Sequence, residues 1–385
     1  MKNILILGAG FGGLETATGL AEALAGAGDD YAITLVDRND AFFVGFSKID
    51  VLFGRATARD VSYRYENLRA EGVRFVRDTI TRIDTAGRIV ETTDHTLPYD
   101  VLVVALGAEL DHAAIPGFLE SGGHEFYSMR GAEALEPVLR DFTAGRLVLG
   151  IFRTPYKCPP APYEVACQLD ELFRARGVRD AIELSMVIPG ARPVPNPDVS
   201  DLLEARLAEH GVELLAGRPI ESVDAAGRRV LIPDGAVDFD LFVGVPVHVP
   251  PAVIVASGLS DGGFLAVDQR TLETRVPDVY AVGDVTHIPV GDKVVPKAGA
   301  FAEDAARTVV SEILRREGLV ADRVPFAARG ACYADLGGGE VARLDADFLG
   351  GDTPSMTVEG PSRELRGDKE RFASSRRDRW FRTPG

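Results

Sequence analysis

A cysteine in a proline-rich segment is the feature of this sequence most suggestive of chemistry. Cys158 lies within residues 156–164, which read YKCPPAPYE. Proline fits the first turn of a helix, where amide hydrogens lack partners, so we expect Cys158 just before a helix N-terminus. The helix end and the adjacent Lys157 would both favour the thiolate. The segment therefore indicates a reactive cysteine, with a buried structural thiol as the alternative.

The other two cysteines carry weaker signals. Cys332, in the stretch Arg329 to Tyr333, is on its own most simply a core thiol. Cys167 lies on the expected helix after Cys158 and is interpreted as structural. Three cysteines and six histidines without close Cys/His spacing do not indicate a zinc site, so we expect no metal. So few cysteines also argue against a disulfide scaffold and suit a reducing compartment.

A glycine motif near the start of the chain predicts a dinucleotide site. Residues 8–13 read GAGFGG, between an apolar strand and a helical pattern. Gly8 would make the tight turn, Gly10 would let a pyrophosphate approach the backbone, and Gly13 would allow close helix–strand packing. The phosphates would then bind the helix N-terminus. Asp37 ends the next strand and would accept a hydrogen bond from a ribose hydroxyl.

Later segments indicate which dinucleotide binds. The strand 101–106 leads into Gly107-Ala108, which resembles the turn that closes the first FAD segment of flavoproteins with two dinucleotide-binding domains. The apolar strand 279–282 ends in Gly283-Asp284, which resembles the segment beside the FAD ribityl chain. Asp284 is the residue we expect to bind the ribityl hydroxyls. The predicted cofactor is therefore FAD.

A second unit of the same kind has lost its nucleotide motif. After the strand 147–152 the sequence has only Gly150 where a second glycine motif is expected, and Cys158 follows. The next strand ends in Pro189-Gly190, with no acid to bind a ribose. These losses argue against NAD(P)H as the electron donor.

Alternating strand and helix patterns must position these residues, and they predict an α/β fold with parallel sheets. We expect two Rossmann-like FAD/NAD(P)-type domains of the glutathione-reductase-like kind and a small C-terminal α+β domain. The first unit is predicted from a strand at 3–7, a helix at 12–27 and a strand at 33–36; the second from a strand at 146–152, a helix at 161–177 and a strand at 182–188. Hairpins are expected at 80–92 and 220–232.

Domain boundaries follow from the same patterns. We expect an FAD-binding domain at 1–109 and 246–320, a second Rossmann-like domain at 110–245, and a C-terminal domain at 321–385. The C-terminal segment 369–382 offers Phe372, Trp380 and Phe381 among several arginines. Such a helix would either lie on a membrane surface or dock on the protein's own core.

Composition excludes several classes of function. The net charge is −16 with a pI near 4.9, which argues against a nucleic-acid partner. No signal peptide is indicated, and the longest apolar runs have the length of strands. We therefore expect a cytoplasmic protein, or one that is peripheral on the inner face of the cell membrane.

The proline-rich cysteine segment also resembles the signature of the sulfide:quinone oxidoreductase family, which includes the flavoprotein subunit of flavocytochrome c sulfide dehydrogenases. The similarity extends over most of the chain, including the segment Pro296-Lys297-Ala298-Gly299 beside the flavin and Cys332 in a Gly-x-Cys-Tyr context. The resemblance implies that Cys158 and Cys332 form a redox pair flanking the flavin. It implies an acid/base role for Glu164. Lys297 would stabilise negative charge on reduced flavin.

These expectations define the predicted site. The catalytic residues are Cys158, Cys332, Glu164 and Lys297. The cofactor-binding residues are Gly8, Gly10, Phe11, Gly13, Asp37, Ala105, Gly107, Gly283, Asp284, Lys297 and Gly299. Glu164 and Lys297 would otherwise be a solvated helix glutamate and a surface lysine.

Two departures from the family pattern matter. Many quinone-linked members carry a third essential cysteine in the segment that corresponds to 126–129, which here reads FYSM. Some members attach FAD to a cysteine, but 41–48 contains none, so FAD is expected to be non-covalent.

The predicted activity is oxidation of sulfide, or a related sulfur species, with electrons passed through FAD to a quinone. The expected partners are a small sulfur compound, a quinone or another acceptor, and a second copy of the chain if it forms a homodimer. Three alternatives stay open: a type II NADH:quinone oxidoreductase, a flavoprotein that reduces a cytochrome partner, and a non-catalytic FAD-binding interaction protein.

Overall fold

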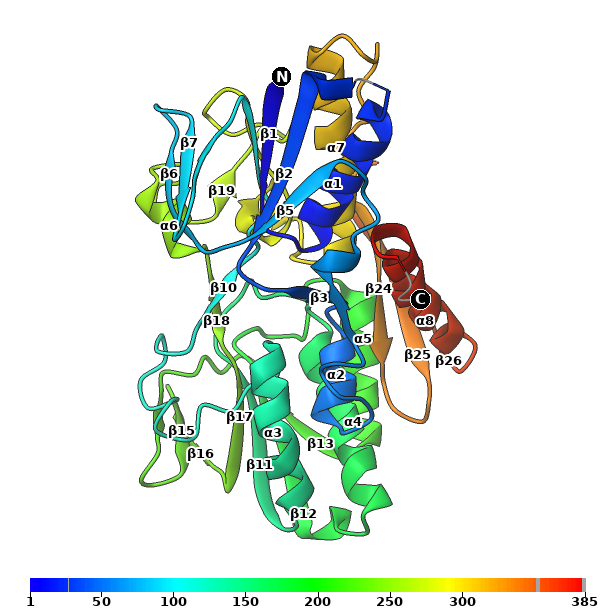
Figure 1. Ribbon diagram of the computed structural model, residues 1–385. Coiled ribbons are helices and arrows are strands. Elements are labelled where there is room, and N and C mark those ends of the chain that lie inside the picture. The colour runs from blue at the N-terminus through cyan, green and yellow to red at the C-terminus, as the bar shows by residue number, and fades with distance from the viewer. Residues whose placement is uncertain (27, 351–353, 383–385) are drawn as a thin grey trace.

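A five-stranded parallel sheet forms the first half of the structure. The computed structural model describes residues 1–26, 28–350 and 354–382. The sheet order is β20-β9-β1-β2-β5, with all pairs parallel (Figure 1). Its central strands are apolar because both faces are covered. The strands are β1 (Lys2–Leu7), β2 (Tyr31–Asp37), β5 (Val73–Arg77), β9 (Val101–Val104) and β20 (Val279–Ala281).

Two helices pack together beside this sheet. They are α1 (Phe11–Leu24) and α7 (Gly299–Arg316), which lie side by side in Figure 1. A Cβ atom on Gly19 of α1 would lie 3.2 Å from Val310 of α7, so the glycine lets these two helices approach closely. The predicted first strand, helix and second strand are confirmed, although Ala27, the end of the predicted helix, lies outside the described residues.

A four-stranded parallel sheet forms the second half, in the order β13-β12-β11-β17. The antiparallel strands β10 and β18 cross between the two sheets (Figure 1). Both predicted hairpins are present, as β6–β7 and β14–β15. The elements are β11 (Gly145–Ile151), β12 (Ile182–Val187), β13 (Val212–Leu215), β17 (Leu241–Val245), α3 (Met129–Asp141), α4 (Ala161–Ala175), α5 (Pro197–Glu209), β10 (Glu109–Asp111), β18 (Val247–Val249), β6 (Ile80–Asp84), β7 (Ile89–Thr92), β8 (Thr96–Pro98), β14 (Ser222–Asp224), β15 (Arg229–Ile232) and β16 (Gly235–Asp238).

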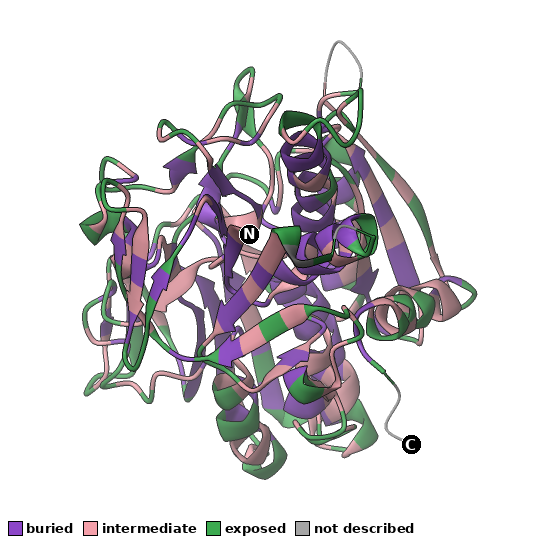
Figure 2. Cartoon of the chain, turned by 45° about the horizontal axis from the view of Figure 1, so that its top comes forward, coloured by how far each residue is buried: buried purple, intermediate pink, exposed green. Residues whose placement is uncertain are grey.

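Short elements complete the part before the C-terminal sheet. They are β3 (Ala41–Phe43), α2 (Ser47–Leu52), β4 (Ser62–Arg64), α6 (Ala252–Ala256), β19 (Leu265–Ala266), β21 (Thr286–His287), β22 (Pro289–Val290) and β23 (Lys293–Val294), with 3₁₀ turns at Gly28–Asp30, Tyr65–Asn67, Arg179–Ala181 and Gly283–Val285. Figure 2 shows the buried residues concentrated in the central strands and on the inner faces of the helices.

The C-terminal segment folds into an antiparallel sheet followed by one helix. The strands are β24 (Arg329–Asp335), β25 (Val341–Asp347) and β26 (Ser355–Ser362), and the helix is α8 (Leu365–Trp380). Residues 351–353 and 383–385 of this segment lie outside the described residues.

The aromatic residues at the end of α8 belong to the core. Trp380 is fully buried and Phe381 is 3% exposed. The indole N–H of Trp380 donates to Glu15 of α1 at 3.0 Å, and its ring meets Phe11 and Phe42 edge-on. The interpretation of these aromatics as a membrane-surface anchor is therefore wrong, because they pack on the protein's own core. No helix among the described residues is long and apolar enough to span a membrane.

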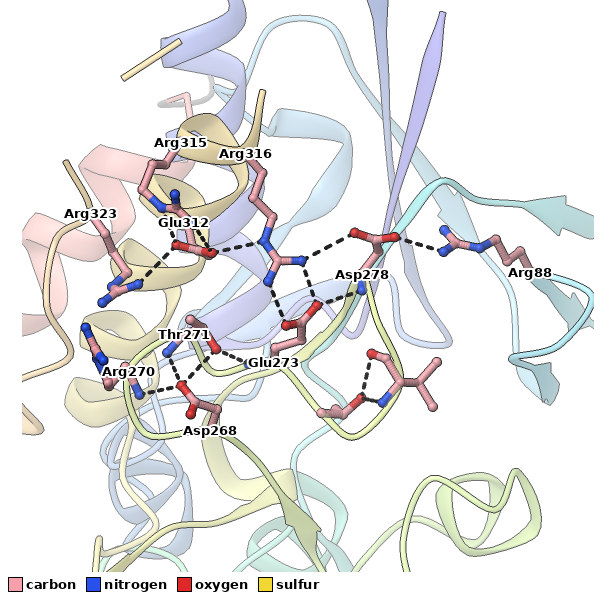
Figure 3. Close-up of polar contacts among 12 residues, drawn as sticks. Arg88, Asp268, Arg270, Thr271, Glu273, Asp278, Glu312, Arg315, Arg316 and Arg323 are labelled. Atoms are coloured by element: carbon pink, nitrogen blue, oxygen red, sulfur yellow. Dashed lines mark hydrogen bonds and ion pairs between the residues drawn. The ribbon is translucent and has the colours of Figure 1, made fainter. Parts of the chain in front are cut away.

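An ion-pair network holds the strand that leads to Gly283-Asp284 (Figure 3). Fully buried Glu312, near the end of α7, accepts hydrogen bonds from Arg315, Arg316 and Arg323. Arg316 also pairs with Glu273 at 2.6 Å, and with Asp278, which precedes β20, at 3.4 Å. Asp278 in turn pairs with Arg88 of the β6–β7 turn at 2.8 Å. The network thus ties the C-terminal end of α7 to the entrance of β20.

Replacement of Trp380 by alanine is expected to destabilise the folded protein by about 3–5 kcal/mol, because it empties a filled core position and leaves Glu15 without the indole hydrogen bond. Denaturant unfolding of the cofactor-bound protein would measure the change. Leu119→Ala, at a position that is 54% exposed, is the control and should change stability by less than about 0.5 kcal/mol. Equal effects of the two substitutions would contradict the docking of α8.

Candidate active site

One large cavity collects most of the predicted site residues. Its volume is about 430 Å³, and its walls come from both sheets and from the C-terminal segment. Every residue predicted to bind the cofactor lines it except Gly13, which lies behind Gly8. The lining residues among them are Gly8, Gly10, Phe11, Asp37, Ala105, Gly107, Gly283, Asp284, Lys297 and Gly299.

The first helix N-terminus is shaped for phosphate groups. The amides of Phe11, Gly12 and Gly13 donate to no acceptor in the part of the chain that the structure describes. A Cβ on Gly10 would meet nothing within 4 Å, whereas one on Gly13 would lie 1.8 Å from the carbonyl oxygen of Gly8. Free amides at a helix end, open space at Gly10 and tight packing at Gly13 fit a dinucleotide.

Carboxylates and a second helix end complete the cofactor side of the cavity. Asp37 accepts from the Ala9 amide at 2.7 Å, which fixes its carboxylate beside the glycine turn. Burial raises the pKa of Asp284, while Lys157, Lys297 and Lys48 oppose that rise. The helix α7 begins at Gly299, and a Cβ there would collide with the ring of Phe11. The residues present therefore fit FAD.

Lys297 is a buried lysine with fixed partners. It is 5% exposed, and its ammonium donates to the carbonyls of Asp284 at 2.6 Å and Thr286 at 3.1 Å. The ammonium also lies 3.4 Å from the centroid of the Phe264 ring. Burial lowers the pKa of Lys297 to about 8, against the attraction of Asp284. The alternative of a surface lysine is wrong.

Cys158 lies just before α4, where it was predicted, but its surroundings disfavour the thiolate. Its carbonyl accepts from the amide of Ala161, the first residue of α4, and its own amide donates to the Lys297 carbonyl at 2.9 Å. Its φ is +51°, in the left-handed region. Burial raises the pKa of the Cys158 thiol far above its usual range, with Cys332 and Glu164 adding to the rise. The predicted preference for the thiolate is wrong for this state, because desolvation exceeds the opposing attraction of Lys48 and Lys369.

The structure brings Cys332 to the same cavity as Cys158, as free thiols. Cys332 lies in the middle of β24, and burial raises its pKa to about 11. Cys167 is fully buried in the core and does not line the cavity, in agreement with a structural role. Residues 174 positions apart in the sequence thus share one cavity wall.

Glu164 is buried on the first turn of α4, behind the cavity lining. It is 1% exposed and pairs with Lys369 of α8. Its Oε2 atom has no hydrogen-bond partner among the described residues. Burial raises the pKa of Glu164, while Lys369 opposes the rise. The alternative of a solvated helix glutamate is therefore wrong.

Several lining residues escaped the sequence analysis. Lys48 of α2 lines the cavity, and so do Tyr127, Tyr333 and Phe372. One sequence feature could have pointed to Lys48: it lies at the end of 41–48, the segment after Asp37 that was considered only for a cysteine able to attach FAD. Phe46, Tyr333 and Phe372 lie together, with ring centroids 5.8–6.0 Å apart between neighbours.

The N-terminus of α4 offers no phosphate cradle. Pro159, Pro160 and Pro162 have no amide hydrogen. The amide of Ala161 donates to Cys158, and those of Tyr163 and Glu164 donate to the Pro160 carbonyl. A Cβ on Gly150 would collide with Ile220 and Phe242, so this glycine serves packing. The contrast with the open amides of α1 agrees with the predicted loss of nicotinamide binding.

Comparison with known proteins identifies relatives of two kinds. The family profile "Pyridine nucleotide-disulphide oxidoreductase" matches residues 2–150 and 163–306. The mitochondrial sulfide:quinone oxidoreductase of Dictyostelium discoideum is 27% identical over 304 residues, which cover 75% of this chain and 66% of that protein. The chain thus spans just under two thirds of that relative. A type II NADH:quinone oxidoreductase of Staphylococcus aureus is 34% identical over 337 residues, 82% of each chain.

A solved structure supports the predicted fold class. The sulfide:quinone oxidoreductase from the hyperthermophilic bacterium Aquifex aeolicus superposes with a TM-score of 0.85 at 20% identity, covering 97% of this chain and 90% of that one. The α/β prediction is confirmed.

Gly13→Ala should abolish flavin retention, because the added methyl would clash with the Gly8 carbonyl and displace the phosphate-binding turn. The ratio of absorbance near 450 nm to that of the protein would measure bound flavin after purification. Gly26→Ala, where a Cβ meets nothing within 4 Å, is the matched control and should remain yellow. Full flavin content in Gly13→Ala would contradict the assignment.

The raised pKa of Cys158 predicts slow alkylation. After chemical reduction, its reaction with iodoacetamide should still be rising with pH above about 9, where an ordinary cysteine approaches its plateau. A raised pKa means that less thiolate is present at any given pH. Peptide mass spectrometry over a pH series would report the rate at Cys158 separately. A plateau below pH 8 would show that the thiolate is already formed.

Proposed function

We propose that this chain, which belongs to the pyridine nucleotide-disulphide oxidoreductase family, uses FAD to oxidise sulfide, or a related sulfur species, through Cys158 and Cys332, with a quinone as electron acceptor. The observation that carries the proposal is the presence of both cysteines on the wall of the cavity that fits the dinucleotide. The relatives named sulfide:quinone oxidoreductase support it.

The cofactor would be held by the residues already described. The amides at the start of α1 would bind its phosphates, and Asp284 would accept hydrogen bonds from its hydroxyl groups. When bound, FAD would supply a two-electron acceptor. Lys297, held by two carbonyl groups, would present positive charge to the cavity without moving.

Sulfur chemistry would begin from an oxidised pair. Hydrosulfide would attack the disulfide between Cys158 and Cys332, forming one S–S bond as the other breaks. One cysteine would then carry a persulfide and the other would leave as a thiolate. Since burial disfavours that thiolate, the lysines near the cavity must offset the cost, and Lys48 and Lys369 already act in this direction on Cys158.

Glu164 would donate and accept protons behind the pair of cysteines. Its burial favours the protonated carboxylic acid, and Oε2 is free to exchange a proton because Lys369 occupies Oε1. The segment 126–129 contributes Phe126 and Tyr127 to the cavity wall where a third cysteine would be expected. The persulfide would therefore be held by Cys158 or Cys332, without a third cysteine to receive it.

An aromatic group at the C-terminal part of the cavity supports a quinone as acceptor. Phe46, Tyr333 and Phe372 all line the cavity and would give a planar apolar ring stacking partners. Access to a membrane-borne quinone would need a surface other than the buried aromatics of α8.

Type II NADH:quinone oxidoreduction is the second candidate, because a relative with that name is 34% identical to the chain. The start of α4 argues against NADH binding, because its prolines have no amide hydrogen and its other amides already donate to carbonyl groups of the chain. The two candidates differ in which reductant bleaches the flavin.

Anaerobic stopped-flow absorbance near 450 nm should show rapid bleaching by sulfide and little by NADH. Cys158→Ser and Cys332→Ser should each reduce the sulfide-dependent rate by at least about 100-fold, because the bridge can no longer form. Cys167→Ser is the matched control and should keep the rate, since Cys167 does not reach the cavity. Fast bleaching by NADH alone would favour the second candidate, and sulfide bleaching that survives both cavity substitutions would exclude the cysteine mechanism.

A further inference from the structure

We propose that Lys48, Lys157 and the hydroxyl of Tyr127 form a subsite for a small monovalent anion beside Cys158, and that hydrosulfide is its occupant. The assignment of hydrosulfide rests on the proposed function, whereas the anion subsite itself does not. The roles described above use neither Lys157 nor the Tyr127 hydroxyl, and they involve Lys48 only through its effect on the Cys158 thiolate.

Lys48 and Lys157 differ from the other lysines of the chain. Lys2 pairs with Glu317, Lys369 pairs with Glu164, and Lys297 donates to two carbonyls. Lys293 is exposed on β23. Lys48 and Lys157 both line the cavity, and neither has a carboxylate within 4.0 Å or a hydrogen-bond acceptor among the described residues.

Two unpaired ammonium groups in the lining of one cavity are electrostatically costly. Burial, and after it the repulsion from Lys157, lowers the pKa of Lys48 to about 7. The carboxylates that face them are Glu125 and Asp284, and both act at longer range than an ion pair. An anion between the ammonium groups would remove the repulsion and restore their charge.

Glu125 does not fill this role, because its oxygens are already used. They accept from the amides of Tyr127 and Ser128 and from the Ser128 hydroxyl. These bonds instead fix the backbone of Tyr127, so that its ring lines the cavity. The ammonium of Lys48 lies 6.0 Å from the centroid of that ring.

The Tyr127 hydroxyl is a buried donor without a partner. Tyr127 is 4% exposed, and its Oη makes no hydrogen bond among the described residues. His248 packs edge-on against the ring at 5.1 Å. It stays neutral, because burial and the nearby lysines lower its pKa to about 3. Lys297, the third ammonium group of the cavity, is already held by two carbonyls. The site therefore combines two unpaired cations and one neutral donor.

This combination selects for one negative charge and small size. It would concentrate the anionic form of sulfide next to Cys158, the sulfur that is to be attacked or to receive the new bond. Lys48 is also one of the groups that lower the pKa of Cys158. One ammonium would thus serve both the incoming nucleophile and the leaving thiolate.

Thiocyanate, a monovalent sulfur-containing anion, is the probe. Its dissociation constant would be measured at constant ionic strength from the perturbation of the flavin spectrum, in oxidised holoenzyme and in Cys158→Ser protein. Lys48→Met and Lys157→Met should each weaken binding by about 10- to 100-fold, the loss of one charge-assisted hydrogen bond. Lys48→Arg should retain binding within about threefold. Lys293→Met, the exposed control, should leave it unchanged.

Four other results would contradict all or part of the proposal. Absence of thiocyanate binding in the wild-type protein, or equal binding in Lys48→Met, Lys157→Met and Lys293→Met, would overturn the subsite. A lowered flavin midpoint potential in the lysine variants with unchanged thiocyanate affinity would show that the lysines serve the flavin instead. Lysine-dependent binding that does not compete with sulfide in the bleaching assay would overturn hydrosulfide as the occupant. Because binding is also measured in Cys158→Ser, failure of the sulfide chemistry remains distinguishable from failure of the subsite.

Discussion

The main physical constraint on the cavity is desolvation: burial disfavours the charged form of the ionisable groups in and around it. Burial raises the pKa values of Cys158, Cys332, Glu164 and Asp284, and it lowers those of Lys48 and Lys297. Each group is therefore shifted toward its neutral form. Charge can be created there only where an opposite charge is close, which couples the protonation of thiols, carboxyls and ammonium groups to one another and to any bound anion.

The fold satisfies this constraint by bringing together segments that are remote in the sequence. The glycine turn comes from the first strand, Cys158 from the second sheet, and Cys332 with Lys369 from the C-terminal segment. The backbone connects them directly, since the Cys158 amide donates to the carbonyl of Lys297. A shift of the segment that carries Lys297 would therefore move the cysteine as well.

The sequence made local features predictable and left long-range ones open. The glycine turn, both hairpins and the place of Cys158 before α4 follow from residue types within a few positions, and all were found. The thiolate prediction failed because a helix end is visible in the sequence, whereas desolvation by distant segments is not. The same reason explains why Trp380 was considered as an anchor and why Lys48 was missed. The meeting of Cys158 and Cys332 in one cavity was available only by resemblance, since no local pattern relates positions 174 residues apart.

The position of Trp380 has a consequence for biosynthesis. This residue packs against Phe11 in the phosphate-binding turn, 369 positions earlier in the sequence, while Glu15 accepts its hydrogen bond. The glycine turn is therefore synthesised long before the residue that completes its packing. Until α8 has been synthesised, the nascent chain carries the whole glycine motif without the packing that supports it.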